Sequence, residues 1–316
     1  MEHEFHRWIK DRARTQTPSE SSMVEIGVGD DAAVIRTHEL SSNLLNEDGQ
    51  ANLVISTDTI AAGTHFETDN VDLATLQTIG RKLIAVNLSD LAAMAAIPKF
   101  ATLNFQLPRS FDLPHLKALY EGCESLANQF NMTLVGGDTN TWAGHLVLSA
   151  TVVGVRESTL SRWTLHDAAV GDVVLVSGCF GGSILGRHFS FEPRVELARY
   201  LATRYDIRAA TDASDSLSID LMAIANASDV SFEIDTESIP IAPELASFDR
   251  DEQVSRALGD GEDFELLMTT TPEVAEVIIH DHELPTPVVA IGRVASGPPG
   301  LRSIDGVPIP IRGYEH

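Results

Sequence analysis

The chain has 316 residues, with 22 Lys and Arg against 46 Asp and Glu, so its formal net charge at pH 7 is −24. A protein this acidic repels nucleic acid and anionic membrane surfaces, and no apolar run approaches the roughly 20 residues that a membrane-spanning helix needs. Because 43% of the residues are hydrophobic and only 22% are charged, the composition predicts folded, soluble domains rather than disorder.

The cysteine content and the N-terminus predict a cytoplasmic protein. Cys123 and Cys179 are the only cysteines, and they can form neither a disulfide framework nor a C-x-x-C metal or redox motif. We expect both thiols to be buried. The N-terminal residues lack the apolar core of a signal peptide.

In the first half of the chain, strands are mixed with two long helices. A short amphipathic helix at 3–14 and a polar connector at 15–22 come first. The hydrophobic patterns then predict strands at 31–36, 53–60, 100–107 and 146–155, a loop at 38–52, and helices at 72–96 and 113–130. Asp112, followed by Leu113 and Pro114, marks the start of the second helix.

A polar stretch at 156–161 is the candidate domain junction. Beyond it the patterns predict strands at 172–177, 230–234, 264–270 and 287–294, and helices at 194–204, at 217–227 and from 272. Alternating helices and strands indicate a layered α/β or α+β fold. The length suggests two domains or one large one, and we place the two domains at 1–156 and 157–316.

Some of the acidic residues lie in segments where burial of a carboxylate would cost free energy. A set of aspartates sits in apolar or glycine-rich segments instead of polar loops: Asp30, Asp31, Asp58, Asp90, Asp138, Asp212 and Asp215. A buried carboxylate requires a cation, and few basic residues are near in sequence. Hydroxyl residues accompany the aspartates, namely Ser56, Thr57, Ser89, Thr139 and Ser214. Hard oxygen ligands of this kind are those that Mg²⁺ prefers.

Each motif alone has a simpler interpretation. A single Asp beside Gly or Ser is more often a turn or helix-cap residue, and we assign Asp72, Asp112 and Asp172 to that class. Five segments with the same pattern favour metal binding. A Walker phosphate loop is absent from the sequence. The glycines at 178, 181 and 182 could approach a phosphate, although a plain strand-to-helix turn is favoured. His65 is either a loop residue or a functional one.

Taken together, these segments resemble the thiamine-monophosphate kinase family, within an ATP-binding superfamily that includes aminoimidazole ribonucleotide synthetase. The resemblance covers nearly the whole chain in order. It rests on the motifs Gly29-Asp30-Asp31, Ser56-Thr57-Asp58, Asn87-Leu88-Ser89-Asp90, Gly136-Gly137-Asp138-Thr139, Asp212-Ala213-Ser214-Asp215 and Gly261-Glu262-Asp263-Phe264, together with His65.

The resemblance implies direct in-line transfer of the ATP γ-phosphoryl group to thiamine monophosphate, giving thiamine diphosphate and ADP. It implies several Mg²⁺ ions held by Asp30, Asp31, Ser56, Thr57, Asp58, Asp90, Asp138, Asp212 and Asp215. ATP would meet Gly137, Asp138, Arg162 and Ser214, and thiamine monophosphate would meet His65, Glu262 and Tyr314. It also implies a homodimer in which the mixed sheets of residues 1–156 form a shared β-barrel, while residues 157–316 complete the active-site cleft.

Three features depart from the family pattern. Ser216 follows Asp215 where the family usually has glycine, the segment after Gly182 is about one helix shorter, and an aromatic residue that contacts adenine has no clear counterpart near Tyr120. The alternatives are a related ATP-dependent synthetase acting on another phosphorylated small molecule, and a non-catalytic module that binds a divalent ion or a partner.

Overall fold

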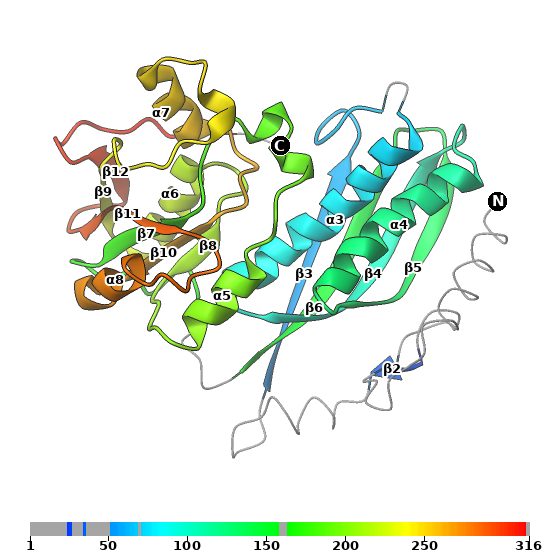
Figure 1. Ribbon diagram of the computed structural model, residues 1–316, viewed down its shortest axis with the longest axis horizontal. Coiled ribbons are helices and arrows are strands. Elements are labelled where there is room, and N and C mark those ends of the chain that lie inside the picture. Colours follow the sequence, from blue (N-terminus) through cyan, green and yellow to red (C-terminus); the bar gives the residue numbers. More distant parts are fainter. Residues whose placement is uncertain (1–23, 27–33, 36–50, 69–70, 158–162, 314–316) are drawn as a thin grey trace. The chain divides into compact units, whose positions relative to one another are not determined.

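The computed structural model describes residues 24–26, 34–35, 51–68, 71–157 and 163–313 (Figure 1). The chain divides into two compact units. Unit 1 comprises Met1–Leu91 and Ile97–Thr159, and unit 2 comprises Ala92–Ala96 and Leu160–His316. The mixed α/β fold class is thus confirmed. The expected helix at 3–14, the connector at 15–22 and most of the loop at 38–52 lie outside the described residues.

Unit 1 is built on a four-stranded sheet with the strand order β3-β6-β4-β5. The strands are β3 (Ala51–Ala61), β4 (Ile97–Pro108), β5 (Thr133–Trp142) and β6 (Val147–Glu157). β6 pairs antiparallel with β3 and β4, whereas β4 and β5 are parallel. A separate small ribbon pairs β1 (Val24–Ile26) with β2 (Val34–Ile35).

Two helices, α3 (Leu73–Ala93) and α4 (Leu113–Gln129), cover one face of this sheet (Figure 1). Alternation along β4 shows which face is covered, because Leu103 and Phe105 are buried while Thr102 and Asn104 are exposed. As expected, Asp112 caps α4, and its carboxylate accepts the His115 N–H.

The two helices approach each other backbone to backbone. A Cβ placed on Gly80 would lie 2.0 Å from the Leu119 carbonyl oxygen, and one on Gly122 would lie 1.9 Å from that of Gln77. The Cys123 thiol, fully buried as expected, donates to the Gly80 carbonyl oxygen at 3.2 Å. Only glycine allows this crossing.

Unit 2 contains a six-stranded sheet with the order β12-β9-β11-β7-β10-β8. Its strands are β7 (Val173–Ser177), β8 (Ala210–Asp212), β9 (Ser231–Ile234), β10 (Leu266–Thr270), β11 (Val288–Ala295) and β12 (Gly300–Ser303). All neighbouring strands are antiparallel except β9 and β12.

Within the described residues unit 2 has four helices, two of which make most of the helix contacts with its sheet. The four helices are α5 (Val195–Ala202), α6 (Leu217–Ser228), α7 (Arg250–Gly259) and α8 (Pro272–Ile279), with short 3₁₀ turns at Ser183–Leu185, Arg187–Phe189 and Pro243–Leu245. Leu217 and Leu221 of α6 join Val174 and Val176 of β7 in one core cluster, while α8 contacts β7 and β11. No helix in the described ranges is long and apolar enough to cross a membrane.

The sequence patterns missed several elements. β5 carries Gly136 and Gly137, which are unusual inside a strand. α7 buries only Ala257 and Leu258, so its apolar periodicity is faint. The helix predicted over 72–96 is present, but it ends at Ala93. The positive φ of 51° at Ala95 is incompatible with a continuing helix.

Candidate active site

A pair of carboxylates stands between β3 and α3 in unit 1. The Ser56 hydroxyl donates to the Asp90 carboxylate, which joins the strand to the helix. The Asp58 N–H donates to Asn87 Oδ1 at 3.1 Å, and Ser149 Oγ donates to the Asp58 carbonyl oxygen at 3.1 Å. These contacts fix the strand on both sides of Asp58.

The pair is electrostatically costly. Burial, with repulsion from Asp90, raises the pKa of Asp58 to about 7, and burial also raises the pKa of Asp90. Within the described part of the chain, neither carboxylate forms an ion pair with lysine or arginine. A divalent cation would remove the repulsion and satisfy oxygens that are hard ligands. The arrangement therefore fits a cation, although no group of three His, Cys, Asp or Glu side chains able to hold one occurs among the described residues.

Asp138 lies at the opposite edge of the same sheet. Its register partner is Asn104 of β4, whereas Asp58 of β3 pairs with Ala150 of β6. Three strand spacings separate β3 from β5, on the order of 14 Å. Asp138 is exposed and its carboxylate accepts from Asn140 Nδ2 at 2.6 Å. Within one chain the structure therefore does not bring Asp138 to the Asp58 and Asp90 pair.

Two further predicted residues of unit 1 have defined partners. His65 Nδ1 accepts the Ala61 N–H at 3.1 Å, and the His65 carbonyl oxygen accepts from the fully buried Lys82 Nζ at 3.0 Å. The loop that carries His65 is thus anchored to α3. Thr57 Oγ1 donates to Thr151 Oγ1 at 2.9 Å, on the sheet face opposite to α3. Gly137 has a φ of 157°, and a Cβ there would lie 2.0 Å from the Leu103 carbonyl oxygen.

In unit 2, Asp212 ends β8, and Ser214 and Asp215 follow it in the turn before α6. The Asp220 carboxylate accepts the N–H groups of Asp215 and Ser216, each at 3.1 Å. Ser216 is the N-cap of α6: its Oγ accepts the Ile219 N–H at 3.1 Å and donates to the Arg312 carbonyl oxygen at 2.6 Å. Its φ of 166° is extended, so serine is accommodated without strain where the family usually has glycine.

The segment 261–265 meets this turn directly. The Glu262 N–H donates to the Ser214 carbonyl oxygen at 2.7 Å, which brings together a residue predicted to bind ATP and one predicted to bind thiamine monophosphate. Glu262 has a φ of 54°, and Phe264 has a φ of 53°. Backbone conformations of this kind are uncommon outside glycine and concentrate at functional sites.

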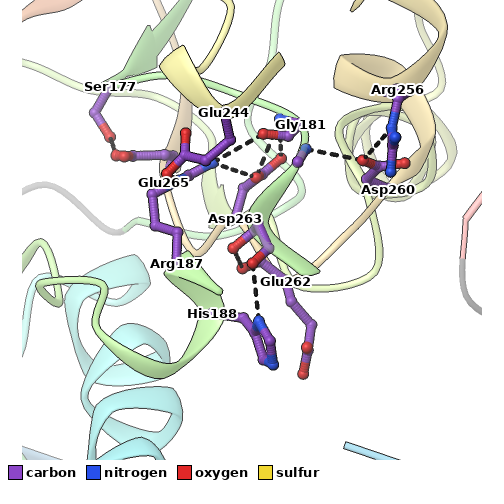
Figure 2. Close-up of polar contacts among 12 residues, drawn as sticks. Ser177, Gly181, Arg187, His188, Glu244, Arg256, Asp260, Glu262, Asp263 and Glu265 are labelled. Carbon is purple, nitrogen blue, oxygen red and sulfur yellow. Dashed lines mark hydrogen bonds and ion pairs between the residues drawn. The ribbon is translucent and has the colours of Figure 1, made fainter. Parts of the chain in front are cut away.

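The neighbouring acids are neutralised by arginines (Figure 2). Arg187 Nη2 contacts Asp263 Oδ1 at 2.8 Å. Arg194 reaches both Glu265 oxygens, at 2.6 Å from Nε and 2.5 Å from Nη2, and Ser177 Oγ donates to the same carboxylate at 2.6 Å. Sequence reasoning missed these pairs, because the partners of Glu265 stand far from it in the chain.

The glycine cluster that follows β7 has a structural role. Gly181 N–H donates to both Asp263 oxygens, at 3.0 and 3.1 Å, and Gly182 N–H donates to Asp260 Oδ2 at 2.8 Å (Figure 2). Because protein carboxylates occupy these amides, they do not form a phosphate cradle. Cys179, in the same loop, is half-buried, contrary to the expected full burial. Asp30, Asp31, Arg162 and Tyr314 lie outside the described residues.

Comparison with known protein families assigns each half of the chain to a domain family. Residues 29–156 match the family described as AIR synthase related protein, N-terminal domain, and residues 146–300 match the corresponding C-terminal domain. The thiamine-monophosphate kinase of Rhodopirellula baltica is 36% identical over 297 residues, which cover 93% of this chain and 89% of that protein. The chain belongs to the thiamine-monophosphate kinase family.

Solved structures agree with this assignment. The thiamine-monophosphate kinase crystal structure from Stenotrophomonas maltophilia K279a superposes with a TM-score of 0.79 at 31% identity, covering 97% of this chain and 98% of that one. The AaThiL complex with AMPPCP and TMP shares the fold, with a TM-score of 0.74 at 24% identity, over 98% of this chain and 96% of that one.

Proposed function

We propose that the protein is an ATP-dependent kinase that phosphorylates thiamine monophosphate to thiamine diphosphate with release of ADP. Its family membership supports this activity. The observation of the structure that carries it is the half-buried Asp58 and Asp90 pair, which has no arginine or lysine partner within the described residues. The acceptor phosphate is largely anionic at neutral pH, because its second pKa is about 6. Direct attack therefore needs no general base.

Magnesium is the cation that suits this pair. Mg²⁺ takes one or two protein carboxylates and completes its shell with water and phosphate oxygens, so two aspartates are a sufficient protein contribution. When bound, it would neutralise charge on the transferring phosphoryl group. We assign Asp58, Asp90 and Ser56 to this role in unit 1, and Asp212 and Asp215 in unit 2. Thr57 belongs to the proposed set by family resemblance, because its hydroxyl lies on the opposite face of the sheet. Asp30, Asp31 and Asp138 complete the proposed metal set.

The remaining contacts are divided between the two substrates. We assign ATP to Gly137, Asp138, Arg162 and Ser214, and thiamine monophosphate to His65, Glu262 and Tyr314. Supporting observations are the anchored His65 loop and the bond from Glu262 to Ser214. The N-terminal half, residues 1–156, would supply most metal contacts, and residues 157–316 the Glu262 contact. A cytoplasmic location suits a biosynthetic enzyme.

We also propose a homodimer through the sheet of unit 1. The face opposite to α3 and α4 carries Leu53 and Ile55 on β3, which are 56% and 64% exposed, as an unpaired docking face would be. If a two-fold axis parallel to the barrel axis closes two such sheets into a barrel, the β3 edge of each chain would meet the β5 edge of the other. This closure would bring the partner's Asp138 towards Asp58, from which Asp138 of the same chain is separated.

A coupled assay tests the proposed activity. The purified protein is incubated with ATP and thiamine monophosphate, with and without Mg²⁺, and both ADP and thiamine diphosphate are measured. We expect equal amounts of the two products, and only with the metal. ADP released with another phosphorylated acceptor but not with thiamine monophosphate would identify a related synthetase. Absence of Mg²⁺-dependent nucleotide binding in calorimetry would identify a non-catalytic module.

A further inference from the structure

Glu262 is held by its backbone on both sides. Its N–H donates to the Ser214 carbonyl oxygen at 2.7 Å, and its own carbonyl oxygen accepts from Ser183 Oγ at 2.6 Å. Ser183 is fully buried. Glu262 has a φ of 54°, a conformation that costs a non-glycine residue free energy and persists only where its surroundings enforce it. The two hydrogen bonds supply that enforcement.

The segment that carries Ser183 is itself tied to the residue after Glu262. Gly181 N–H donates to both Asp263 oxygens, and Arg187 Nη2 contacts Asp263 Oδ1 at 2.8 Å. Asp263 is 1% exposed, so this anchor lies in the interior. One short stretch of chain, Gly181–His188, therefore fixes two consecutive residues of the segment 261–265.

His188 closes the network from its C-terminal end. The residue is 7% exposed, and its Nδ1 donates to the Ser183 carbonyl oxygen at 2.8 Å. A carbonyl oxygen only accepts, so Nδ1 must carry a proton. In Figure 2 the Glu262 side chain points away from the carboxylates of Asp263 and Glu265. The network thus holds the backbone of Glu262, while its half-buried side chain extends away from those carboxylates.

We propose that Ser183 and His188 are positioning residues for thiamine monophosphate, acting by holding Glu262 in its left-handed conformation. The inference rests on the proposed function, because it takes Glu262 as a contact to that substrate. The cationic thiazolium ring of thiamine monophosphate is the chemistry that the Glu262 carboxylate would recognise. Neither Ser183 nor His188 needs to touch the substrate.

The test separates substrate binding from turnover. Loss of one buried hydrogen bond corresponds to a change of about fivefold in an equilibrium constant. For Ser183→Ala we expect the KM for thiamine monophosphate to rise by about this factor, with kcat and the KM for ATP little changed and the melting temperature lowered by no more than a few degrees. Ser190→Ala, at an exposed serine two residues after this stretch, should leave all four values unchanged.

Two variants of His188 sharpen the test. The amide nitrogen of asparagine can take the place of Nδ1, whereas glutamine reaches the Nε2 position. We expect His188→Asn to keep the KM of the wild type and His188→Gln to raise it as Ser183→Ala does. Equal effects of the two substitutions would overturn the role of the Nδ1 hydrogen bond.

A double-mutant cycle identifies the residue through which Ser183 acts. In a Glu262→Ala background, Ser183→Ala should raise the KM for thiamine monophosphate no further. An additional rise of the same size would show that Ser183 does not act through Glu262. A wild-type enzyme without activity on thiamine monophosphate would overturn the proposed function as well, whereas an active enzyme with an unchanged KM in Ser183→Ala would overturn this inference alone.

Discussion

At the scale of single residues, the partner of each buried acid distinguishes a structural role from a functional one. Asp263, Glu265 and Asp172 each meet an arginine. Such pairs offset the cost of burying a charge and leave no vacancy for a ligand. Asp58 and Asp90 instead face each other. The repulsion between these two carboxylates is the physical reason to place a cation beside them.

Asp58→Asn should abolish most of the activity while leaving the fold intact. We expect kcat to fall by at least about 100-fold, because even the residues that orient metal ligands contribute 10- to 100-fold. The melting temperature should be unchanged or higher, since the substitution removes a half-buried carboxylate that Asp90 repels. The coupled assay and a thermal melt measure both quantities. Asp112→Asn is the matched control, because asparagine caps a helix as well as aspartate does; comparable activity of the two variants would contradict the metal assignment.

At the scale of elements, the contact between α3 and α4 depends on two glycines. Gly80 and Gly122 bring each helix within reach of carbonyl oxygens on the other, Leu119 and Gln77. Glycine inside a helix costs up to about 1 kcal/mol relative to alanine, so both positions trade helix propensity for close packing. α3 also carries Asn87 and Asp90 of the candidate site. The close packing of α3 against α4 therefore helps to set how far Asp90 lies from the strand that carries Asp58.

Gly122→Ala should destabilise the protein although alanine favours helices. The added methyl group would overlap a carbonyl oxygen, and overpacking of this kind costs about 1–3 kcal/mol. Urea unfolding followed by circular dichroism gives the free energy of unfolding. Gly136→Ala is the control, because a Cβ on Gly136 meets nothing within 4 Å. A Gly122→Ala protein as stable as this control would show that the helices can separate at little cost.

At the scale of the whole molecule, the strand order decides which aspartates can meet. β3 and β5 are the two edges of the unit 1 sheet, so the full width of the sheet separates Asp58 from Asp138. A site that uses both must draw one of them from a second chain. This requirement links the proposed homodimer to the proposed activity.

Mixing two inactive variants tests the shared site. Asp58→Asn and Asp138→Asn should each be inactive alone. After subunit exchange, random pairing makes half of the dimers mixed, and each mixed dimer has one intact site, so about a quarter of wild-type activity should return. Differently tagged subunits confirm by co-purification that mixed dimers have formed. Mixed dimers without activity would show that both aspartates act within one chain.

Local patterns predicted much of both units. The helices at 113–130 and 217–227 and the strands at 100–107 and 146–155 match α4, α6, β4 and β6 within a few residues. Apolar context singled out Asp58 and Asp90 because burial of a charge is costly wherever it occurs. The short β8 and the charged α7 were missed because their stability comes from packing within unit 2 rather than from their own periodicity.

The sequence by itself determined the chemistry of this protein: its acidity, the oxygen ligands in apolar segments, and the ordered motifs of its family. Only the tertiary structure decided how these groups are used. It paired Arg194 with Glu265 and occupied the Gly181 amide with Asp263, across separations of more than 70 residues. It also placed Asp138 on the edge opposite to Asp58. Whether a carboxylate is neutralised depends on contacts between segments that are distant in the chain. Which strand residues stand side by side depends on the order of strands in the sheet. Neither can be read from the spacing of residues within one segment.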